Sequence, residues 1–406
     1  MSFCTTTFHQ SILPSDLIFE MAKESASLYN DAARLDYEGK TKAEALKSLT
    51  IQEKTCMFLQ SQSAQAAHQD FFRDKKSFFA ALKEYKTHHN KFKNPPKPPK
   101  GTKFLRAVTF KKSAIRLQGN FLILSTRRPN QPIRVRWSLP IPIWAIIGYN
   151  SVTGWSLNCV VRKDVSQMTL NHSKVMAIDL GSKRIATTFD GTNTTTYSGK
   201  KTMSLTRLRN KINSATKDRL DHLVKDSKKF KRVKRANRRT INRIQNQIKE
   251  VLHKVSRTIV NDAVSKGIGV IAVGDCSDIH DETNLGSNNQ SVQQNPDQKL
   301  RRYIQYKFES VGGTVESVPE HYTSQTCPKC GERHKTSTRT YRCPGCGFSY
   351  DRDGVGGINI YHHAVKVSSG IWLDVVGGLT PPKGWKHHPR LLCSMSDPSR
   401  VVYLAA

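Results

Sequence analysis

Two closely spaced cysteine pairs constrain the fold of this 406-residue chain more than any other feature. Cys327 and Cys330 form the first Cys-x-x-Cys pair, and Cys343 and Cys346 form the second pair twelve residues later. Each pair turns two thiolates toward one centre, and two such pairs complete a tetrahedral site for zinc. A disulfide pair and a redox dithiol are the weaker alternatives. We therefore predict a structural Zn²⁺ site on a ribbon hairpin.

The charge of the chain indicates a polyanionic partner. Lys and Arg number 65 against 32 Asp and Glu, which gives a net charge of +33. Such a surplus repels itself unless a polyanion is near, and nucleic acid attracts Lys and Arg through counterion release. The weaker alternative is that the net charge only keeps the protein soluble. The partner class that the composition favours is therefore nucleic acid, and charge alone does not distinguish DNA from RNA.

The densest basic run lies in residues 203–265, where we expect one or two long helices. Residues 201–250 hold 17 Lys or Arg against 4 Asp or Glu. We predict that the run binds a nucleic-acid backbone through Lys228, Lys229, Lys231, Arg232, Lys234, Arg235, Arg238 and Arg239. A nuclear-import signal is the alternative for this run. A second expectation is that four basic residues of a β-rich region contact RNA or DNA, namely Arg106, Lys111, Lys112 and Arg116.

The remaining composition points to an intracellular protein without membrane contact. The most apolar stretch, residues 137–149, contains two prolines and is too short to span a bilayer. The N-terminal residues lack the charged and apolar regions of a secretory signal. The five cysteines outside the two pairs are scattered, which is not the pattern of a secreted disulfide scaffold.

Hydrophobic periodicity divides the chain into a β part, a helical part and a mixed α/β part. The helical part ends in a basic stretch with four prolines, residues 91–101, which we expect to form a stiff linker. We predict these boundaries: β-rich domain, 1–14 and 101–170; helical domain with the linker, 15–100; α/β domain, 171–322 and 350–370; zinc hairpin, 323–349; tail, 371–406.

Acidic residues at strand ends are the candidates for catalysis. Asp179 ends an apolar strand, where a carboxylate is costly unless it is paired or binds a metal. Asp353 follows the zinc segment at an expected helix start, so N-capping is its alternative role, and Asp351 is the competing acid. Several carboxylates around two Mg²⁺ ions can drive phosphodiester hydrolysis.

The order of these parts resembles the TnpB family of transposon-encoded RNA-guided nucleases. The shared features are the strand with Asp179, basic helices, a second apolar strand, the segment Tyr322–Cys327 before the cysteine pairs, and the Asp-Arg-Asp run after them. The resemblance implies an RNase H-like (RuvC) domain with an inserted four-cysteine zinc ribbon. It also implies an N-terminal β-barrel (wedge) domain carrying a helical recognition insert. The implied partners are a guide RNA and target double-stranded DNA beside a short DNA motif.

The chain departs from the family at one acid. Many relatives carry Glu-Asp at the end of the strand over residues 270–275, but this chain has Gly274 followed by Asp275. Strand side chains alternate between faces, so Asp275 is expected to face away from the site. The site is then inactive, or Asp275 substitutes after a local bend, or Glu320 supplies the carboxylate from the end of the next strand. We favour Glu320 for two reasons. Two strands joined through a helix lie side by side with matching ends, and the chain resembles some TnpB and Fanzor members that have an inert residue at the usual position and a Glu about this far downstream.

These features predict an RNA-guided DNA endonuclease in which Asp179, Glu320 and Asp353 bind two Mg²⁺ ions. Its Zn²⁺ would be structural, and its guide RNA would carry the sequence specificity. A nuclease-dead, RNA-guided DNA-binding repressor is the main rival, because Gly274 replaces an expected acid. A transposase is the third hypothesis, since RNase H-like sites also perform strand transfer.

Overall fold

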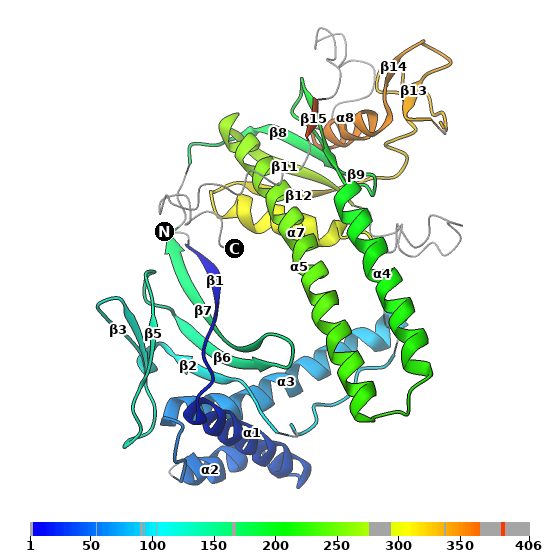
Figure 1. Cartoon of the computed structure of the whole chain (residues 1–406). Coiled ribbons are helices and arrows are strands. Elements are labelled where there is room, and N and C mark those ends of the chain that lie inside the picture. The colour runs from blue at the N-terminus through cyan, green and yellow to red at the C-terminus, as the bar shows by residue number, and fades with distance from the viewer. Residues whose placement is uncertain are drawn as a thin grey trace. The chain divides into compact units, whose positions relative to one another are not determined.

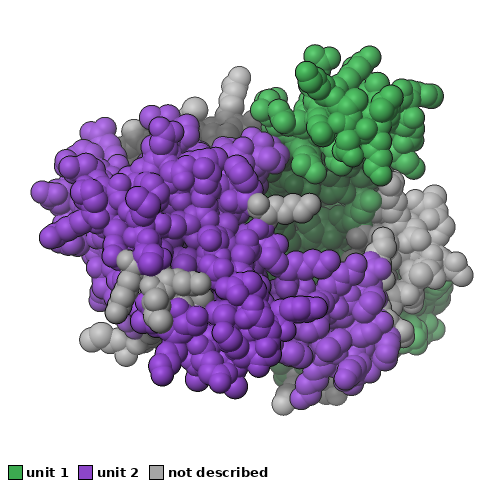
Figure 2. All heavy atoms as spheres, turned by 90° about the horizontal axis from the view of Figure 1, so that it is seen from below, with its two compact units in different colours: residues 1–2, 165–394 green, residues 3–164, 395–406 purple. Residues whose placement is uncertain are grey.

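The computed structural model describes residues 3–53, 55–89, 92, 94–102, 104–164, 168–275, 294–336, 338–365 and 383–385. The described chain forms two compact units, one within residues 3–164 and the other within residues 165–394 (Figure 2).

The first unit contains two antiparallel sheets. The larger has the order β1-β7-β6-β2, from β1 (Phe3–Ser11), β7 (Gly154–Asp164), β6 (Trp144–Asn150) and β2 (Val108–Lys111). The smaller has the order β3-β4-β5, from β3 (Ile115–Gln118), β4 (Phe121–Leu124) and β5 (Ile133–Arg136), after a single 3-10 turn (Lys112–Ala114). Side chains of both sheets, including Phe110, Leu122 and Leu157, share one hydrophobic core. The region predicted to be β-rich therefore forms two sheets that share one core.

Three helices lie in the sequence between β1 and β2, and they are α1 (Asp16–Tyr37), α2 (Lys42–Glu53) and α3 (Ser61–Thr87). Ser15 starts α1 by accepting a hydrogen bond from the backbone N–H of Ile18. Arg106, which we expect from the sequence to contact nucleic acid, makes contacts within the protein. Its guanidinium pairs with Asp74 of α3 at 3.0 Å and lies over the ring of Tyr29 of α1, so it joins the two helices to the segment before β2.

The second unit is built on a six-stranded sheet with the order β12-β11-β8-β9-β10-β15. Its strands are β8 (Asn171–Asp179), β9 (Arg184–Phe189), β10 (Thr194–Ser198), β11 (Ile268–Asp275), β12 (Thr314–Pro319) and β15 (Lys383–Trp385). β8, β9 and β10 are antiparallel neighbours, whereas β11 runs parallel to both β8 and β12. The parallel strands place their carboxyl ends at one edge of the sheet.

Helices cover both faces of this sheet (Figure 1). Alternate residues of β8 and β11, such as Met176 and Ile271, pack in a core with α5 (Lys228–Ser265) and α7 (Asp297–Glu309). The intervening residues, such as Ala177 and Ala272, pack against α8 (Arg352–Val365). α4 (Lys200–Asp221) precedes α5 and packs beside it.

The tail predicted from residue 371 is not wholly separate, because β15 pairs in parallel with β10 as an edge strand of the sheet. The zinc hairpin contains β13 (Thr340–Arg342) and β14 (Ser349–Asp351), which pair antiparallel. Among the described residues, no helix is long and apolar enough to cross a membrane.

Candidate functional site

The ends of β8 and β11 present Asp179 and Gly274 on the same face of the sheet. Ala177 and Ala272 belong to the core that includes Ile360 of α8. Strand side chains alternate in direction, so Asp179 and Gly274, each two residues further along, also face α8. Asp275 consequently belongs to the opposite face.

Glu320, which directly follows β12, occupies the space above Gly274. A Cβ atom placed on Gly274 would lie 2.6 Å from Oε2 of Glu320 and 2.9 Å from Cδ1 of Ile360. Any side chain at position 274 would therefore require the Glu320 carboxylate to move from this place. The glycine that looked like a missing acid is the position into which the acid of the neighbouring strand extends.

Asp179 and Glu320 form a coupled carboxyl pair. Asp179 is densely surrounded by protein but still reaches solvent. Desolvation is the largest cause that raises the pKa of Asp179 well above its usual range, and the negative charges of Glu320 and Asp353 raise it further. A hydrogen bond between Asp179 and Glu320 adds to the same shift. Such a crowded set of oxygen ligands would be stabilised by a divalent cation.

Helix α8 approaches Asp179 closely because of its glycines. A Cβ atom on Gly356 would lie only 2.5 Å from Oδ2 of Asp179. Glycine inside a helix costs roughly 1 kcal/mol relative to alanine, so the Gly-Val-Gly-Gly run from Gly354 has a packing reason. The glycine run in the sequence therefore indicates that α8 packs closely against β8. The predicted site residues do not include these glycines.

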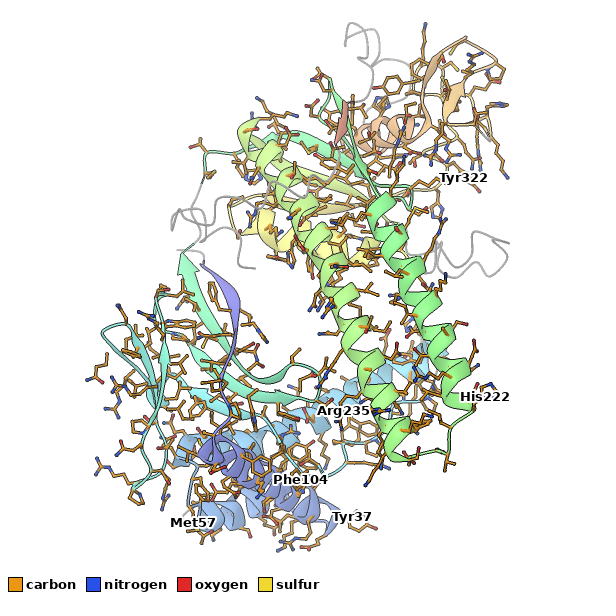
Figure 3. All side chains as sticks on the ribbon, in the orientation of Figure 1. Tyr37, Met57, Phe104, His222, Arg235 and Tyr322 are labelled. Atoms are coloured by element: carbon orange, nitrogen blue, oxygen red, sulfur yellow. The ribbon has the colours of Figure 1, made fainter. Side chains whose placement is uncertain are left out.

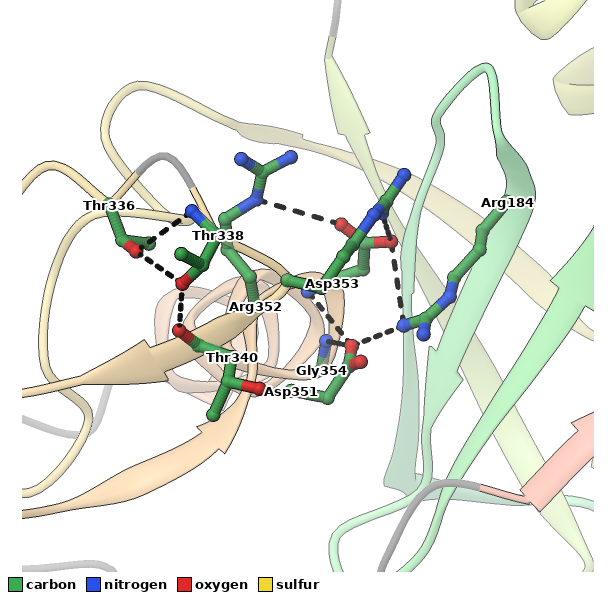
Figure 4. A network of polar contacts seen from close by, with 9 residues as sticks. Arg184, Thr336, Thr338, Thr340, Asp351, Arg352, Asp353 and Gly354 are labelled. Atoms are coloured by element: carbon green, nitrogen blue, oxygen red, sulfur yellow. Dashed lines mark hydrogen bonds and ion pairs between the residues drawn. The ribbon is translucent and has the colours of Figure 1, made fainter.

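Asp351 and Asp353 have different environments (Figure 4). The carboxylate of Asp351 accepts hydrogen bonds from the backbone N–H groups of Asp353 and Gly354, both at 3.1 Å, and it pairs with Arg184. Asp351 is therefore the residue that caps α8. Asp353 is in the first turn of the helix, and its side chain is free of the capping role.

The carboxylate of Asp353 is surrounded by arginines. Its Oδ2 lies 2.6 Å from Nη1 of Arg339 and 3.5 Å from Nη1 of Arg184, and its Oδ1 lies 3.9 Å from Nε of Arg352. Asp353 is near enough to affect the pKa of Asp179, but its nearest charged partner is Arg339 of the zinc hairpin. Arg184 and Arg339 are absent from the predicted site residues, since nothing in their local pattern sets them apart from other basic residues.

Asp275, the runner-up acid, is engaged on the other side of the sheet. Its carboxylate lies 3.7 Å from Nη1 of Arg301 in α7 and accepts a hydrogen bond of 3.2 Å from the hydroxyl of Ser317. These contacts tie β11 to α7 and β12. They give Asp275 a structural role away from Asp179.

The four cysteines gather around one centre. Their sulfur atoms all lie within 4.8 Å of one another, and the Cys327–Cys346 and Cys330–Cys343 sulfur distances are 3.6 and 3.5 Å. Zn–S bonds of about 2.3 Å in a tetrahedron require sulfur separations near 3.8 Å, so the set fits zinc. Among the described residues, this is the one group of three or more potential ligands that already converges on a metal position.

The predicted basic run forms the exposed first half of α5. All eight of its Lys and Arg residues are exposed, whereas Phe230, Val233 and Asn237 between them are partly buried. The second half of α5 carries the buried residues, from Ile244 to Ala263, that pack on the sheet. Figure 3 shows Arg235 in the half of α5 that extends beyond the sheet. A single helix thus joins the core to a cationic surface.

Two family models match parts of this chain. A family model described as "Probable transposase" matches residues 158–280, and one described as "Cas12f1-like, TNB domain" matches residues 298–360. The chain is similar to TnpB-like proteins over part of its length. The TnpB-like protein MJ0751 of Methanocaldococcus jannaschii is 28% identical over 130 residues, covering 31% of this chain and 46% of that protein.

Another protein to which the chain is similar is a CRISPR-associated nuclease. The CRISPR-associated endodeoxyribonuclease Cas12f1 of Sulfoacidibacillus thermotolerans is 32% identical over 104 residues, which cover 25% of this chain and 24% of that protein. The chain thus spans less than half the length of both curated relatives. A solved Cas12f1–sgRNA–target DNA complex contains a similar fold, with a TM-score of 0.57 at 14% identity over 85% of this chain and 82% of that one. The chain therefore has a mixed α/β, multidomain fold similar to that of the protein in this Cas12f1 complex.

Proposed function

We propose that this protein is an RNA-guided DNA endonuclease whose RuvC-type, RNase H-like site uses Asp179, Glu320 and Asp353. The observation that carries the proposal is the Glu320 carboxylate in the space above Gly274, beside Asp179. It supports a carboxylate pair in spite of the missing acid on β11. The Cas12f1 relative is named as an endodeoxyribonuclease, which supports the same chemistry.

Asp179, Glu320 and Asp353 would hold two Mg²⁺ ions, since their oxygen donors and mutual repulsion suit hard cations. When bound, the ions supply an activated water and stabilise the leaving oxygen of the phosphodiester. Asp353 would exchange its contact with Arg339 for this role. Arg184 holds Asp351 at the start of α8 and thereby fixes the backbone that carries Asp353.

The rest of the chain would hold the nucleic acids. The exposed half of α5 would follow the backbone of a guide RNA–target DNA heteroduplex, because its surface reads charge and shape rather than base identity. The first unit would form the wedge domain with its helical recognition insert. The thiol cluster would hold structural Zn²⁺. An intracellular location follows from these partners.

The test begins with the RNA that copurifies with the full-length protein. We would sequence this RNA, prepare duplex DNA matched to its guide portion with randomised flanking bases, and measure cleavage with Mg²⁺. The expected result is cleavage of matched DNA only, lost in Asp179→Asn without loss of RNA binding. Tight binding of matched DNA without cutting would instead support the repressor, and RNA-independent binding of transposon-end DNA would support the transposase described by the matching family model.

A further inference from the structure

The second candidate acid lies beyond the end of its strand. The last pair of the β11–β12 ladder joins Asp275 to Pro319, and Glu320 follows one residue later. A carboxylate at position 274 would be placed by the ladder itself, because Gly274 is a paired residue of β11. The place of Glu320 beside Asp179 depends instead on the turn that follows β12.

A buried threonine in this turn is tied to the backbone of the acid. Thr323 is 3% exposed, and its N–H and its hydroxyl both donate to the carbonyl of Glu320, at 3.2 and 3.0 Å. The turn also contains Tyr322 with a φ of +61°, in the left-handed region that large residues rarely adopt. A turn with such a residue keeps its shape only where surrounding contacts hold it.

Asn359 of α8 supplies contacts of this kind. Its side chain is buried, and its amide nitrogen donates hydrogen bonds to the carbonyls of Thr323 and Thr326, at 2.7 and 2.8 Å. Carbonyl oxygens only accept hydrogen bonds, so only the donor end of the amide can satisfy them. Asn359 therefore fixes the turn at two points, and one of them is the residue that is bonded to Glu320.

The same helix also contacts the first acid. A Cβ atom on Gly356 would lie 2.5 Å from Oδ2 of Asp179. Gly356 and Asn359 are three residues apart, so they lie on the same side of α8. One helix thus packs against Asp179 and, one turn further along, holds the segment that carries Glu320.

We propose that Asn359 is a positioning residue, which holds the turn after β12 so that the Glu320 carboxylate lies beside Asp179. The inference rests on the proposed function, in which both acids bind the same pair of ions. Glu320 needs this support because it extends from a turn, whereas an acid at position 274 would be held by the sheet. Hydrogen-bonded groups that orient a metal ligand contribute about 10- to 100-fold to metal affinity or activity.

The test compares full-length variants by calorimetric titration with Mn²⁺, and Asp179→Asn is the blank for metal that bound RNA takes up. Asn359→Leu keeps the shape of the side chain and removes its donor, so the Mn²⁺ affinity should fall about 10- to 100-fold. Asn30→Leu is the matched control and should keep the parental affinity. Asn30 of α1 also holds a chain segment, through hydrogen bonds with the N–H and the carbonyl of Thr102 at 2.7 and 2.9 Å, but in the other unit.

A change of background separates positioning from a general structural role. In the double variant Gly274→Glu/Glu320→Ala, the second carboxylate stands on β11 and no longer depends on the turn. Adding Asn359→Leu to this background should leave its Mn²⁺ affinity nearly unchanged, whereas a merely structural residue would lower the affinity equally in both backgrounds. Thr323→Val removes only the hydroxyl bond to the Glu320 carbonyl, and it replaces Asn359→Leu if melting or zinc content shows that variant to be misfolded.

Hydrogen exchange gives a second readout that requires no metal. We expect faster exchange at residues 320–326 in Asn359→Leu, and parental exchange in β8, which carries Asp179. Parental Mn²⁺ affinity in Asn359→Leu, or an equal loss in both backgrounds, would overturn the inference. A parent that binds Mn²⁺ through Asp179 but does not cleave matched DNA would contradict only the proposed function, because neither readout requires cleavage.

Discussion

The thiol cluster and the carboxylate cluster lie in the same unit but are assembled in opposite ways. The four thiols come from one segment, Cys327 to Cys346, and their spacing alone brings them together. The carboxylates come from β8, the end of β12 and α8, which are distant in sequence and meet only through sheet topology. A local site can be recognised from its spacing, whereas a site built by topology can exchange one ligand for another on a neighbouring strand.

The strongest test of this difference moves the second carboxylate from the end of β12 to the end of β11. Glu320→Ala should lower cleavage by roughly a thousandfold or more, because metal-bound carboxylates stabilise the transition state by several kcal/mol. Gly274→Glu alone should also slow cleavage, since its side chain would displace the Glu320 carboxylate. The double variant Gly274→Glu/Glu320→Ala should recover part of the cleavage. The measurement is the single-turnover cleavage rate on matched DNA.

Asp275→Asn is the control for this exchange, because Asp275 contacts Arg301 and Ser317 on the other face. We expect it to cleave at nearly the parental rate. A cleavage rate that falls in Asp275→Asn but persists in Glu320→Ala would show that the second acid is Asp275 after all.

Removal of zinc should have the next largest effect, and it tests whether the two clusters are coupled. Cys343→Ser should lose the metal and unfold the hairpin, since structural zinc contributes about 10–16 kcal/mol to such folds. The buried Asn359 of α8 donates hydrogen bonds to the carbonyls of Thr323 and Thr326, at 2.7 and 2.8 Å, and Arg339 of the hairpin pairs with Asp353. The disturbance should therefore spread to the carboxylates and slow cleavage.

Zinc content by mass spectrometry and hydrogen exchange across residues 320–365 would measure this coupling. Cys159→Ser, at a buried thiol of the other unit, should keep its zinc. RNA binding through α5 should survive in both variants. Unchanged exchange in α8 after zinc loss would show that the two clusters are independent.

The contrast also explains what the sequence could and could not reveal. The thiol spacing and the strand ending in Asp179 were recognisable because each is a local pattern. The position of Glu320 above Gly274 was inferred from the rule that neighbouring parallel strands share an edge, and the observed register between β11 and β12 has that arrangement. The choice between Asp351 and Asp353 depended on which carboxylate meets the helix N–H groups, and only three-dimensional contacts decide it. Arg184 and Arg339 could not be singled out for the same reason.

The finest test concerns the closeness of α8 to Asp179. Gly356→Ala would place a methyl group 2.5 Å from Oδ2 of Asp179, so the carboxylate must shift. A displacement near 1 Å can slow catalysis by about 100-fold, and we expect a loss of that order in the cleavage rate. Gly357→Ala is the matched control, because its methyl group would meet Cβ of Phe189 at an ordinary 3.5 Å. Alanine also favours the helix by about 1 kcal/mol, so Gly357→Ala should raise the melting temperature slightly without slowing cleavage. If Gly356→Ala also cleaves at the parental rate, the Asp179 carboxylate can shift without loss of activity. Close packing of α8 against Asp179 would then not be needed for cleavage.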